Sequence, residues 1–436
     1  MNSIQKSLLS AAIAVTSLLA VAPAMATSDP VVLTFSTVGD SRQDPIAPDS
    51  TVVNPAMVGV GSCPVMFAIT DASGNVIANN GLNSNPGLTG QDCKWQQNTA
   101  AWSRIMRSIQ SQKANLLFFN GDMIMGYGKA NAPVTTRSTT TAGVASETPI
   151  ASPAVSDIVT SDLMQFYQQY GFWRGMIANL IETGTYVVPV PGNHETECKR
   201  CGKKAQVENE NAWRDNMADL ILDQARLNKV LPAGLSLNAN WNVNDYPGTA
   251  DSLNTSQKQL SFSFDIGTSH FVVINTDPVG KDGFAPNSWL ANNLSTAYAN
   301  GAKHIFVFGH KPAYFYAYTG SAASSTSSLY NNNAAAGNAF WNIITQYNAT
   351  YFSGHEHIYN VSQPNGGAAY QVIVGAGGSP FEDSKSTGTA PTDRLYSWAT
   401  VSIYQSGKVV MNTWGFDATM TNPVVKLGTF TLPNTQ

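Results

Sequence analysis

The amino-acid sequence predicts an α/β protein in which two packed sheets belong to one domain. Short apolar runs bounded by turn residues recur along the chain, which is the pattern of buried strands. Apolar residues at helical spacing separate several of these runs, as at Trp102, Ile105 and Ile109. A later group of strands contains a hairpin signal at Gln405-Ser406-Gly407, which adds antiparallel character. Strand and helix alternation favours sheets that carry helices on their faces.

Five of the apolar runs share one ending. Each run is followed by Gly and, within one or two positions, by a side chain that can bind a metal ion. The runs are 31–38, 116–119, 186–190, 304–308 and 349–352. The residues that follow the five glycines are Asp40, Asp122, Asn193 with His194 and Glu195, His310, and His355 with Glu356 and His357. Ligands of such sheets bind beyond the carboxyl ends of the strands, so all five turns are expected at one edge.

The other elements follow from the same periodicities. Helical spacing predicts helices around 102–109, 163–180 and 340–344. Further strands are expected in a second sheet with antiparallel character, at 261–266, 270–275, 370–374, 399–404 and 409–414. No internal repeat or linker interrupts the sequence, which predicts a single domain over 27–436.

Composition limits the function classes. The formal net charge is −4 and charged residues make up 12% of the chain, so no broad basic face is expected for gripping nucleic acid. A phosphorylated substrate would therefore be held by local positive charge, such as metal ions or single basic side chains. No later segment is long and apolar enough to cross a membrane.

The first 26 residues have the pattern of an export signal. Lys6 precedes an apolar stretch over 8–21, and Ala24-Met25-Ala26 is a small-x-small cleavage site. A membrane anchor is the alternative, but the apolar stretch is too short to span a bilayer and stops at Pro23. The sequence therefore predicts a secreted or periplasmic protein.

Export favours disulfides between the four cysteines. The favoured pairs are Cys63–Cys93 and Cys198–Cys201. The alternatives are a redox-active Cys-x-x-Cys and a structural zinc site. Segments near 44–94, 129–160 and 319–337 are rich in small and polar residues, which predicts loop insertions that act as lids or substrate walls, or as plain solvated loops.

Histidine usage points to transition-metal chemistry. Four of the six histidines lie in the five turns, and imidazole with Asp and Asn suits Zn²⁺, Mn²⁺ or iron better than Ca²⁺ or Mg²⁺. These four are His194, His310, His355 and His357. The remaining two, His270 and His304, read as structural residues, with His304 at the strand end opposite the site.

The ordered set of five turns resembles the calcineurin-like metallophosphoesterase superfamily, which includes purple acid phosphatases. The resemblance covers about 34–360 and implies a four-layer α/β/β/α sandwich of two mixed sheets flanked by helices. It also implies two divalent or mixed-valence transition metal ions (Zn, Mn or Fe). By position, Asp122 would bridge both ions, Asn193, His310 and His355 would hold one, and Asp40 and His357 would hold the other. His194 would lie just outside the ligands, next to the leaving group, and Glu195 is not implied as a ligand.

The sequence departs from the family pattern in its first motif. The family's usual Asp-x-His is here Asp40-Ser41-Arg42, and Arg offers donors but no lone pair to a metal. Purple acid phosphatases supply a Tyr where this chain has Met125. Tyr127, two residues further, is an alternative donor, but its spacing differs from that of the family and is less favoured. The first metal site then lacks one protein ligand: water fills the gap, the site binds weakly, or one ion suffices. Arg42 would contact a substrate phosphate or pair with a carboxylate such as Asp44.

These observations favour an exported, metal-dependent phosphohydrolase acting on a small phosphomonoester through metal-activated water, with His194 and Arg42 as candidate catalytic residues. Ser41 has no obvious general base to make it a nucleophile. Two alternatives stay open: a phosphodiesterase on nucleotides, nucleic acid or phospholipid head groups, and a non-catalytic binding protein that keeps the fold. Neither the natural substrate nor the oligomeric state follows from the sequence.

Overall fold

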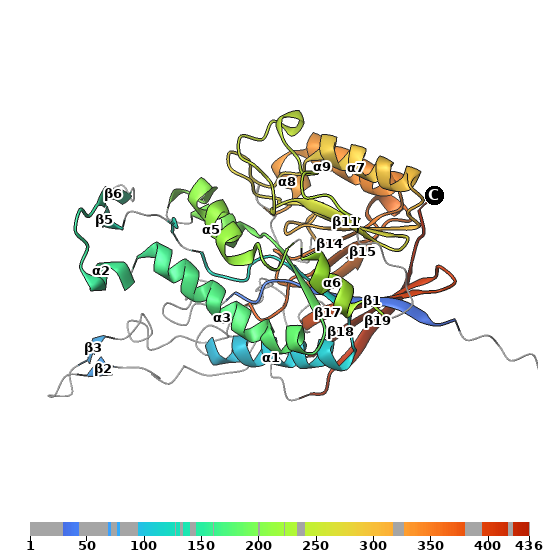
Figure 1. Ribbon diagram of the computed structural model, residues 1–436, viewed down its shortest axis with the longest axis horizontal. Coiled ribbons are helices and arrows are strands. Elements are labelled where there is room, and N and C mark those ends of the chain that lie inside the picture. Colours follow the sequence, from blue (N-terminus) through green and yellow to red (C-terminus); the bar gives the residue numbers. More distant parts are fainter. Residues whose placement is uncertain are drawn as a thin grey trace, which may run out of the picture.

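The structure is a computed structural model, shown in Figure 1, and it describes a large part of the chain. The described residues are 29–42, 69–70, 76–78, 95–126, 128–130, 134–139, 145–159, 161–198, 201–221, 223–232, 240–316, 327–379, 395–416 and 422–435. The expected signal peptide, Asp44, Cys63, Cys93 and Tyr127 lie outside them. Within these ranges, every helix is too short or too polar to cross a membrane.

The first sheet has three parallel strands at one side and antiparallel strands at the other. Its order is β19-β18-β17-β1-β4-β7, in which β1, β4 and β7 run parallel. Residues of the middle strands are almost all buried, as their apolar runs predict. The strands are β1 (Val31–Val38), β4 (Leu116–Asn120), β7 (Tyr186–Val190), β17 (Tyr396–Tyr404), β18 (Val409–Phe416) and β19 (Val425–Leu432).

The second sheet repeats this mixture. Its order is β10-β11-β12-β13-β14-β16-β15, and the four strands from β12 to β16 in this order run parallel. The strands are β10 (Asn240–Trp241), β11 (Phe262–Ile266), β12 (Ser269–Val273), β13 (His304–Phe308), β14 (Thr350–Ser353), β15 (Tyr359–Ser362) and β16 (Gln371–Val374). Three two-stranded sheets pair β2 (Ile69–Thr70) with β3 (Val76–Ala78), β5 (Thr135–Thr139) with β6 (Ala145–Pro149), and β8 (Glu197–Cys198) with β9 (Lys204–Ala205).

Helices cover the outer faces of the two large sheets. In Figure 1, α1 and α3 lie along one side of the molecule, and α7, α8 and α9 lie along the opposite side. The α-helices of the described residues are α1 (Trp95–Ser111), α2 (Val155–Val159), α3 (Asp162–Glu182), α4 (Asn193–Thr196), α5 (Val207–Met217), α6 (Gln224–Val230), α7 (Asn287–Ala299), α8 (Leu329–Asn332) and α9 (Ala334–Gln346). The protein is thus the expected four-layer α/β/β/α sandwich of two mixed sheets.

Strand alternation explains how one strand packs against two layers. Successive side chains of a strand point to opposite faces. Phe118 of β4 faces the other sheet, where its ring stacks 3.8 Å from that of Phe308 of β13. Its neighbour Phe119 faces the helices, with ring centroids 5.0 Å from Trp102 of α1 and 5.2 Å from Trp173 of α3. The apolar runs are continuous because both faces of the central strands are buried.

The assignment of the later strands to one second sheet with antiparallel character is correct for three of them and wrong for two. The strands at 399–404 and 409–414 belong to β17 and β18, which extend the first sheet beside β1. The strands at 261–266, 270–275 and 370–374 instead complete the sheet that contains β13 and β14. An apolar run indicates that a strand is buried but not which strand it pairs with.

The three segments expected to be loop insertions differ in secondary structure and in burial. The β5–β6 hairpin and α2 fall within 129–160, and α2 has no buried residue. Helix α8 and the start of α9 fall within 319–337, where Leu329 is 1% exposed and packs into the core beside α7 and α9. The region around β2 and β3 contributes those two strands to the described residues.

Candidate metal centre

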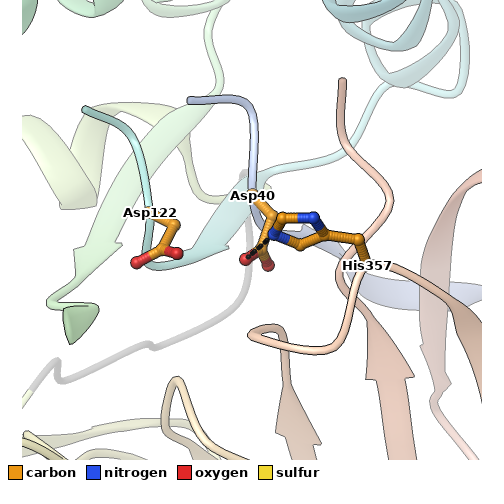
Figure 2. A group of neighbouring side chains, drawn as sticks. All are labelled: Asp40, Asp122 and His357. Carbon is orange, nitrogen blue, oxygen red and sulfur yellow. Dashed lines mark ion pairs between the residues drawn. The ribbon is translucent and has the colours of Figure 1, made fainter. Parts of the chain in front are cut away.

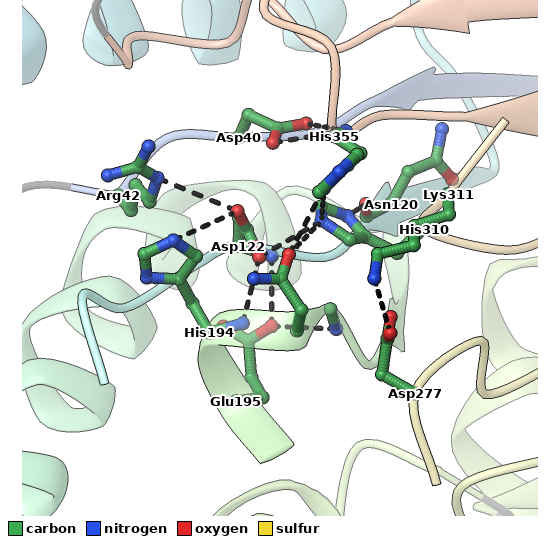
Figure 3. Close-up of polar contacts among 12 residues, drawn as sticks. Asp40, Arg42, Asn120, Asp122, His194, Glu195, Asp277, His310, Lys311 and His355 are labelled. Atoms are coloured by element: carbon green, nitrogen blue, oxygen red, sulfur yellow. Dashed lines mark hydrogen bonds and ion pairs between the residues drawn. The ribbon is translucent and has the colours of Figure 1, made fainter. Parts of the chain in front are cut away.

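The five predicted turns meet at one rim of the sandwich, but they come from both sheets. Asp40 follows β1, Asp122 follows β4 and Asn193 begins α4 just after β7, so the first sheet supplies three turns. His310 follows β13, and His355 and His357 follow β14 in the second sheet. Figure 3 shows side chains from these turns facing one another. The two sheets therefore place their parallel strand ends on a common edge.

The backbone is unusual at three of the predicted ligands. Asp40, Asp122 and His355 have positive φ angles of 62°, 56° and 69°. A non-glycine residue rarely adopts this left-handed conformation, which costs of the order of 1 kcal/mol or more per residue. Hydrogen bonds fix these turns, including Asp40 N–H to the carbonyl of Gly121 at 2.9 Å. Strained residues persist only where the surrounding structure holds them in place, and they are found most often at functional sites.

The glycines of the repeated pattern make room for the ligand side chains. A Cβ atom on Gly354 would lie 2.1 Å from Oδ2 of Asp40. A Cβ on Gly121 would lie 2.6 Å from Nδ1 of His310. Both distances are far inside van der Waals contact, so the turns need glycine for close approach as well as for chain reversal.

One half of the centre brings four donor residues together. Oδ1 of Asn193 lies 3.0 Å from Nε2 of His310 and 3.1 Å from Nδ1 of His355. The two imidazole nitrogens are 3.2 Å apart. Oδ1 of Asp122 lies 3.1 Å from Nε2 of His310. We call Asp122, Asn193, His310 and His355 the four-donor half.

The other half is formed by Asp40, Asp122 and His357, which Figure 2 shows side by side. Their ligand atoms all lie within 4.8 Å of one another, and all three residues are buried. Nε2 of His357 lies 3.4 Å from Oδ1 of Asp40. The backbone N–H of His355 donates to both oxygens of Asp40, at 3.2 and 3.0 Å, and orients that carboxylate. We call these residues the three-donor half.

The donor set fits metal ions. Nδ1–H of His310 donates to the carbonyl of Asn120 at 2.7 Å, which leaves the lone pair of Nε2 directed at Asn193 and Asp122. Two imidazole nitrogens, an amide oxygen and carboxylates crowd a buried space in which they would repel one another unless a proton or a metal cation lay between them. Imidazole, carboxylate and amide donors together suit borderline transition metals such as Zn²⁺, Mn²⁺ or iron.

The pKa shifts of the buried groups also indicate a pocket that favours positive charge. Burial would lower the pKa of His310, but the charge of Asp122 and its hydrogen bond outweigh burial and raise that pKa to about 10. Burial would raise the pKa of Asp122, but the charges of His194 and His310 hold it well below its usual range. Burial raises the pKa of Asp40 well above its usual range. The pocket therefore attracts positive charge, and protons compete with metal ions for the same donors.

His194 lies beside the four-donor half without being one of its donors. Nδ1–H donates to the carbonyl of Met125 at 2.5 Å, which fixes the ring and turns Nε2 toward the site. Nε2 lies 3.7 Å from Oδ2 of Asp122. The backbone N–H of His194 donates to Oδ1 of Asp122 at 3.1 Å. A proton on Nε2 would face the space next to the carboxylate of Asp122.

Arg42 is buried against the same carboxylate. Nε lies 3.5 Å from Oδ2 of Asp122, and Nη1 lies 3.2 Å from the sulfur of Met125. Arg42 is 5% exposed and Asp122 is 2% exposed. The guanidinium therefore faces the carboxylate of Asp122, whereas Asp44, the carboxylate suggested as its partner, lies outside the described residues.

Glu195 has a role that sequence reasoning missed. Its carboxylate accepts backbone N–H bonds from Gly192, Asp122 and Met123 at 2.7, 2.9 and 2.7 Å, and from Ile124 at 3.2 Å. Burial, followed by the charge of Asp122, raises its pKa to about 7. Glu195 thus ties the turn after β4 to the turn after β7. Its place in the Gly-Asn-His-Glu motif was the available signal, but a motif does not say which backbone groups a carboxylate will meet.

A buried ion pair lies next to the four-donor half and also escaped prediction. Nζ of Lys311, which follows His310, contacts Oδ1 of Asp277 at 2.6 Å and also pairs with Asp282. Oε2 of Glu197 accepts from the amide of Asn193 at 3.4 Å. Asp277, Asp282 and Glu197 form an acidic group, and Lys311 sets one positive charge against it through ion pairs with the two aspartates. Asp277 follows a strand end that lacks the glycine of the repeated pattern, so the pattern did not point to it.

The remaining sequence predictions near the centre have clear outcomes. Cys198 and Cys201 form the predicted disulfide. His270 is buried and structural, with hydrogen bonds of 2.6 Å to Asp265 and 2.8 Å to Asn293. His304 begins β13 and lies at the opposite end of that strand from His310.

Comparison with known proteins places the chain in a family. The model of the calcineurin-like phosphoesterase family matches residues 92–359, more than half of the chain. None of the curated proteins compared with the sequence matches it.

Three solved structures resemble this chain weakly, each with a TM-score below 0.5. Purple acid phosphatase PPD1 from yellow lupin (Lupinus luteus) seeds is 10% identical, with a TM-score of 0.48, over 93% of this chain and 54% of its own. This chain thus spans about half the length of the lupin protein. A dimetal phosphatase from Danio rerio is 10% identical, with a TM-score of 0.46, over 93% of this chain and 99% of its own. GAP50, the anchor in the inner membrane complex of Plasmodium, is 11% identical, with a TM-score of 0.37, over 93% and 90%. On the strength of the family match, this chain belongs to the calcineurin-like phosphoesterase family.

Proposed function

We propose that the protein is a metal-dependent phosphohydrolase that cleaves a small phosphomonoester. The observation that carries the proposal is the convergence of Asp122, Asn193, His310 and His355, with Asp40 and His357 beside them, on one buried rim. These residues would hold two transition-metal ions. When bound, such ions polarise a phosphoryl oxygen and lower the pKa of water, so that phosphate esters are cleaved without a covalent enzyme intermediate.

The chain's own residues would divide the remaining work. Asp40 and Asp122 supply the negative charge that holds the cations, and their backbone hydrogen bonds fix the direction of the carboxylates. His194, with Nδ1–H fixed on the carbonyl of Met125, would hold a proton on Nε2 and donate it to the departing alkoxide. Glu195 keeps the two ligand turns in register through its four backbone contacts.

The low content of charged residues in this chain favours a small substrate over a long nucleic acid. Charged residues are 12% of the chain and the net charge is −4, so long nucleic acid would find little electrostatic attraction on the surface as a whole. Positive charge at the site would come from the bound cations and from single basic groups such as Arg42. A compact phosphomonoester matches this local charge.

The decisive experiment combines metal analysis with a substrate panel. We expect the purified protein to contain Zn, Mn or Fe and to hydrolyse aryl phosphate monoesters faster than the corresponding diesters. Asp122→Ala should remove turnover, because this carboxylate serves both halves of the centre. Turnover that survives in Asp122→Ala would contradict the proposal. Faster diester cleavage would favour a phosphodiesterase, and bound metal without turnover on either ester class would favour a binding protein.

We also propose that the protein is exported and that residues 1–26 are removed. Support comes from Lys6, the apolar stretch over 8–21 and the Ala24-Met25-Ala26 site. N-terminal sequencing of protein recovered outside the cytoplasm should begin near Thr27. Recovery of uncleaved chain in the cytoplasmic fraction would refute export.

A further inference from the structure

The two halves of the metal centre offer unequal numbers of protein donors. The four-donor half consists of Asn193, His310 and His355, which contact one another, and of Asp122, whose Oδ1 contacts His310. Within the described part of the chain, the other half gathers one ligand atom each from Asp40, Asp122 and His357. A cation in the four-donor half would therefore have more protein ligands than a cation in the three-donor half.

Arg42 adds a permanent positive charge beside the bridging carboxylate. Its Nε lies 3.5 Å from Oδ2 of Asp122, the oxygen other than the one that faces His310. The guanidinium stays protonated at any physiological pH and has no lone pair to give to a metal. It therefore competes with a cation for Asp122, and it repels a dication placed close to it.

Met125 contacts the same guanidinium through its sulfur. Its sulfur is 3.2 Å from Nη1 of Arg42, and its carbonyl holds the ring of His194. Met125 is 2% exposed, so the contact is buried. A thioether is a weak acceptor and a soft ligand, so Met125 offers little to a hard or borderline dication.

We propose that Arg42 takes over the charge of a second ion, so that one metal ion binds tightly in the four-donor half and a second binds weakly in the three-donor half. One dication balances the carboxylates of Asp40 and Asp122, and the guanidinium already adds a further positive charge to the same pocket. This inference rests on the metal centre of the proposed function. It goes beyond that function because it assigns unequal affinities to the two halves.

A titration of metal-stripped protein with Mn²⁺ tests the inference without reference to activity. Calorimetry should give one tight site and a second site at least about a hundredfold weaker, given the charge so close by. At one equivalent, electron paramagnetic resonance should show isolated Mn²⁺ and no exchange-coupled pair.

Two substitutions separate charge from ligation. Arg42→Gln removes the charge without adding a metal ligand and should tighten the weak site by about tenfold. Arg42→His removes the charge and adds an imidazole donor, and it should produce the exchange-coupled signal at two equivalents. Arg174→Gln is the matched control, because Arg174 pairs with Asp219 on the surface at 2.7 Å and should leave both affinities unchanged.

Three results would overturn the inference. Two ions of equal affinity in the unaltered protein, with no change in Arg42→Gln, would show that the guanidinium does not weaken the second site. Loss of a second tight ion in Tyr127→Phe would place the additional donor at Tyr127 instead. No Mn²⁺ bound in any variant would refute the proposed function itself, and this inference with it.

Discussion

His194 is the residue whose chemistry can be separated most cleanly from metal binding. Its Nε2 is 3.7 Å from Oδ2 of Asp122 and its Nδ1–H is committed to Met125. We expect His194→Gln to lower kcat by about 10²–10⁴ for alkyl phosphates, whose leaving groups need a proton, and by much less for p-nitrophenyl phosphate. Rates across a series of leaving groups, with metal content measured in parallel, test this. An equal loss for good and poor leaving groups would contradict proton donation by His194.

Glu195 holds the turn after β4 to the turn after β7 through acceptors alone. In Glu195→Gln an NH₂ group would replace one carboxylate oxygen. That group cannot accept the hydrogen bonds that the backbone N–H groups now donate to the oxygen. We expect a loss of roughly 2–3 kcal/mol in the free energy of unfolding and weaker metal binding. Denaturant unfolding and a metal titration measure both. Glu182→Gln, on the exposed end of α3, is the control and should change neither quantity.

His304 makes stability depend on pH. Burial, aided by the charge of Lys303, lowers its pKa to about 4, and its two ring nitrogens have no hydrogen-bond partner among the described residues. The unfolded chain binds the proton at an ordinary pKa near 6.5, so the contribution of His304 is fully present above that pH and is lost as pH falls toward 4.

In His304→Phe this part of the pH dependence should disappear. The free energy of unfolding of the variant should fall less than that of the unaltered protein between pH 6.5 and 4, by up to about 3 kcal/mol. Urea unfolding at several pH values measures the difference. Parallel profiles for the two proteins would show that His304 does not titrate with folding.

At the scale of elements, the turns at the strand ends bring the candidate metal-binding side chains together. Each turn must reverse the chain and leave space for a side chain from another turn. Gly354, after β14, illustrates the second requirement, because a Cβ there would lie 2.1 Å from Oδ2 of Asp40. The turn of one sheet thus limits the position of a ligand carried by the other sheet.

Gly354→Ala should therefore displace Asp40 and weaken metal binding in the three-donor half. We expect a lower free energy of unfolding as well, by about 1–3 kcal/mol, as for other overpacked buried sites. Gly175→Ala in α3 is the matched control, since no atom lies within 4 Å of its added Cβ, and it should be neutral or stabilising by up to about 1 kcal/mol. Equal effects of the two substitutions would contradict the steric argument.

At the scale of the whole molecule, the two sheets are joined by an aromatic core and by the residues of the candidate metal centre. Phe35 of β1 contacts the rings of Phe306, Phe308 and Phe352 of the second sheet at 4.9–5.9 Å. At the rim, His310 of the second sheet reaches Asp122 and Asn193 of the first. Bound cations would therefore connect the sheets in the folded state, with no such site in the unfolded chain.

Removal of metal should lower the thermal stability of the protein. Ligand that binds the folded state at about a hundred times its Kd adds about 2.7 kcal/mol. We expect a chelator to lower Tm by several degrees and added Mn²⁺ or Zn²⁺ to restore it. Asp122→Asn should start from a lower Tm and show no response to the chelator. A chelator response of the same size in Asp122→Asn would indicate a stabilising site elsewhere.

The sequence by itself determined the positions of most central strands and of the candidate metal-binding residues that follow them. Runs such as 116–119 and 186–190 are apolar because both faces of β4 and β7 are buried, so they stand out locally. Asp122 and Asn193 stand out because metal-binding side chains directly follow those runs and their glycines. By contrast, β19 has several exposed residues and gave no continuous apolar signal.

Tertiary structure decided which strands share a sheet and what each side chain near the ligands contacts. Strand pairing depends on partners distant in the chain, so β17 could not be assigned to β1 from its own residues. The contacts of Arg42 with Asp122 and Met125, and the four backbone bonds to Glu195, join separate turns. Local sequence fixes the type and order of such groups, but their distances arise when the two sheets pack against each other.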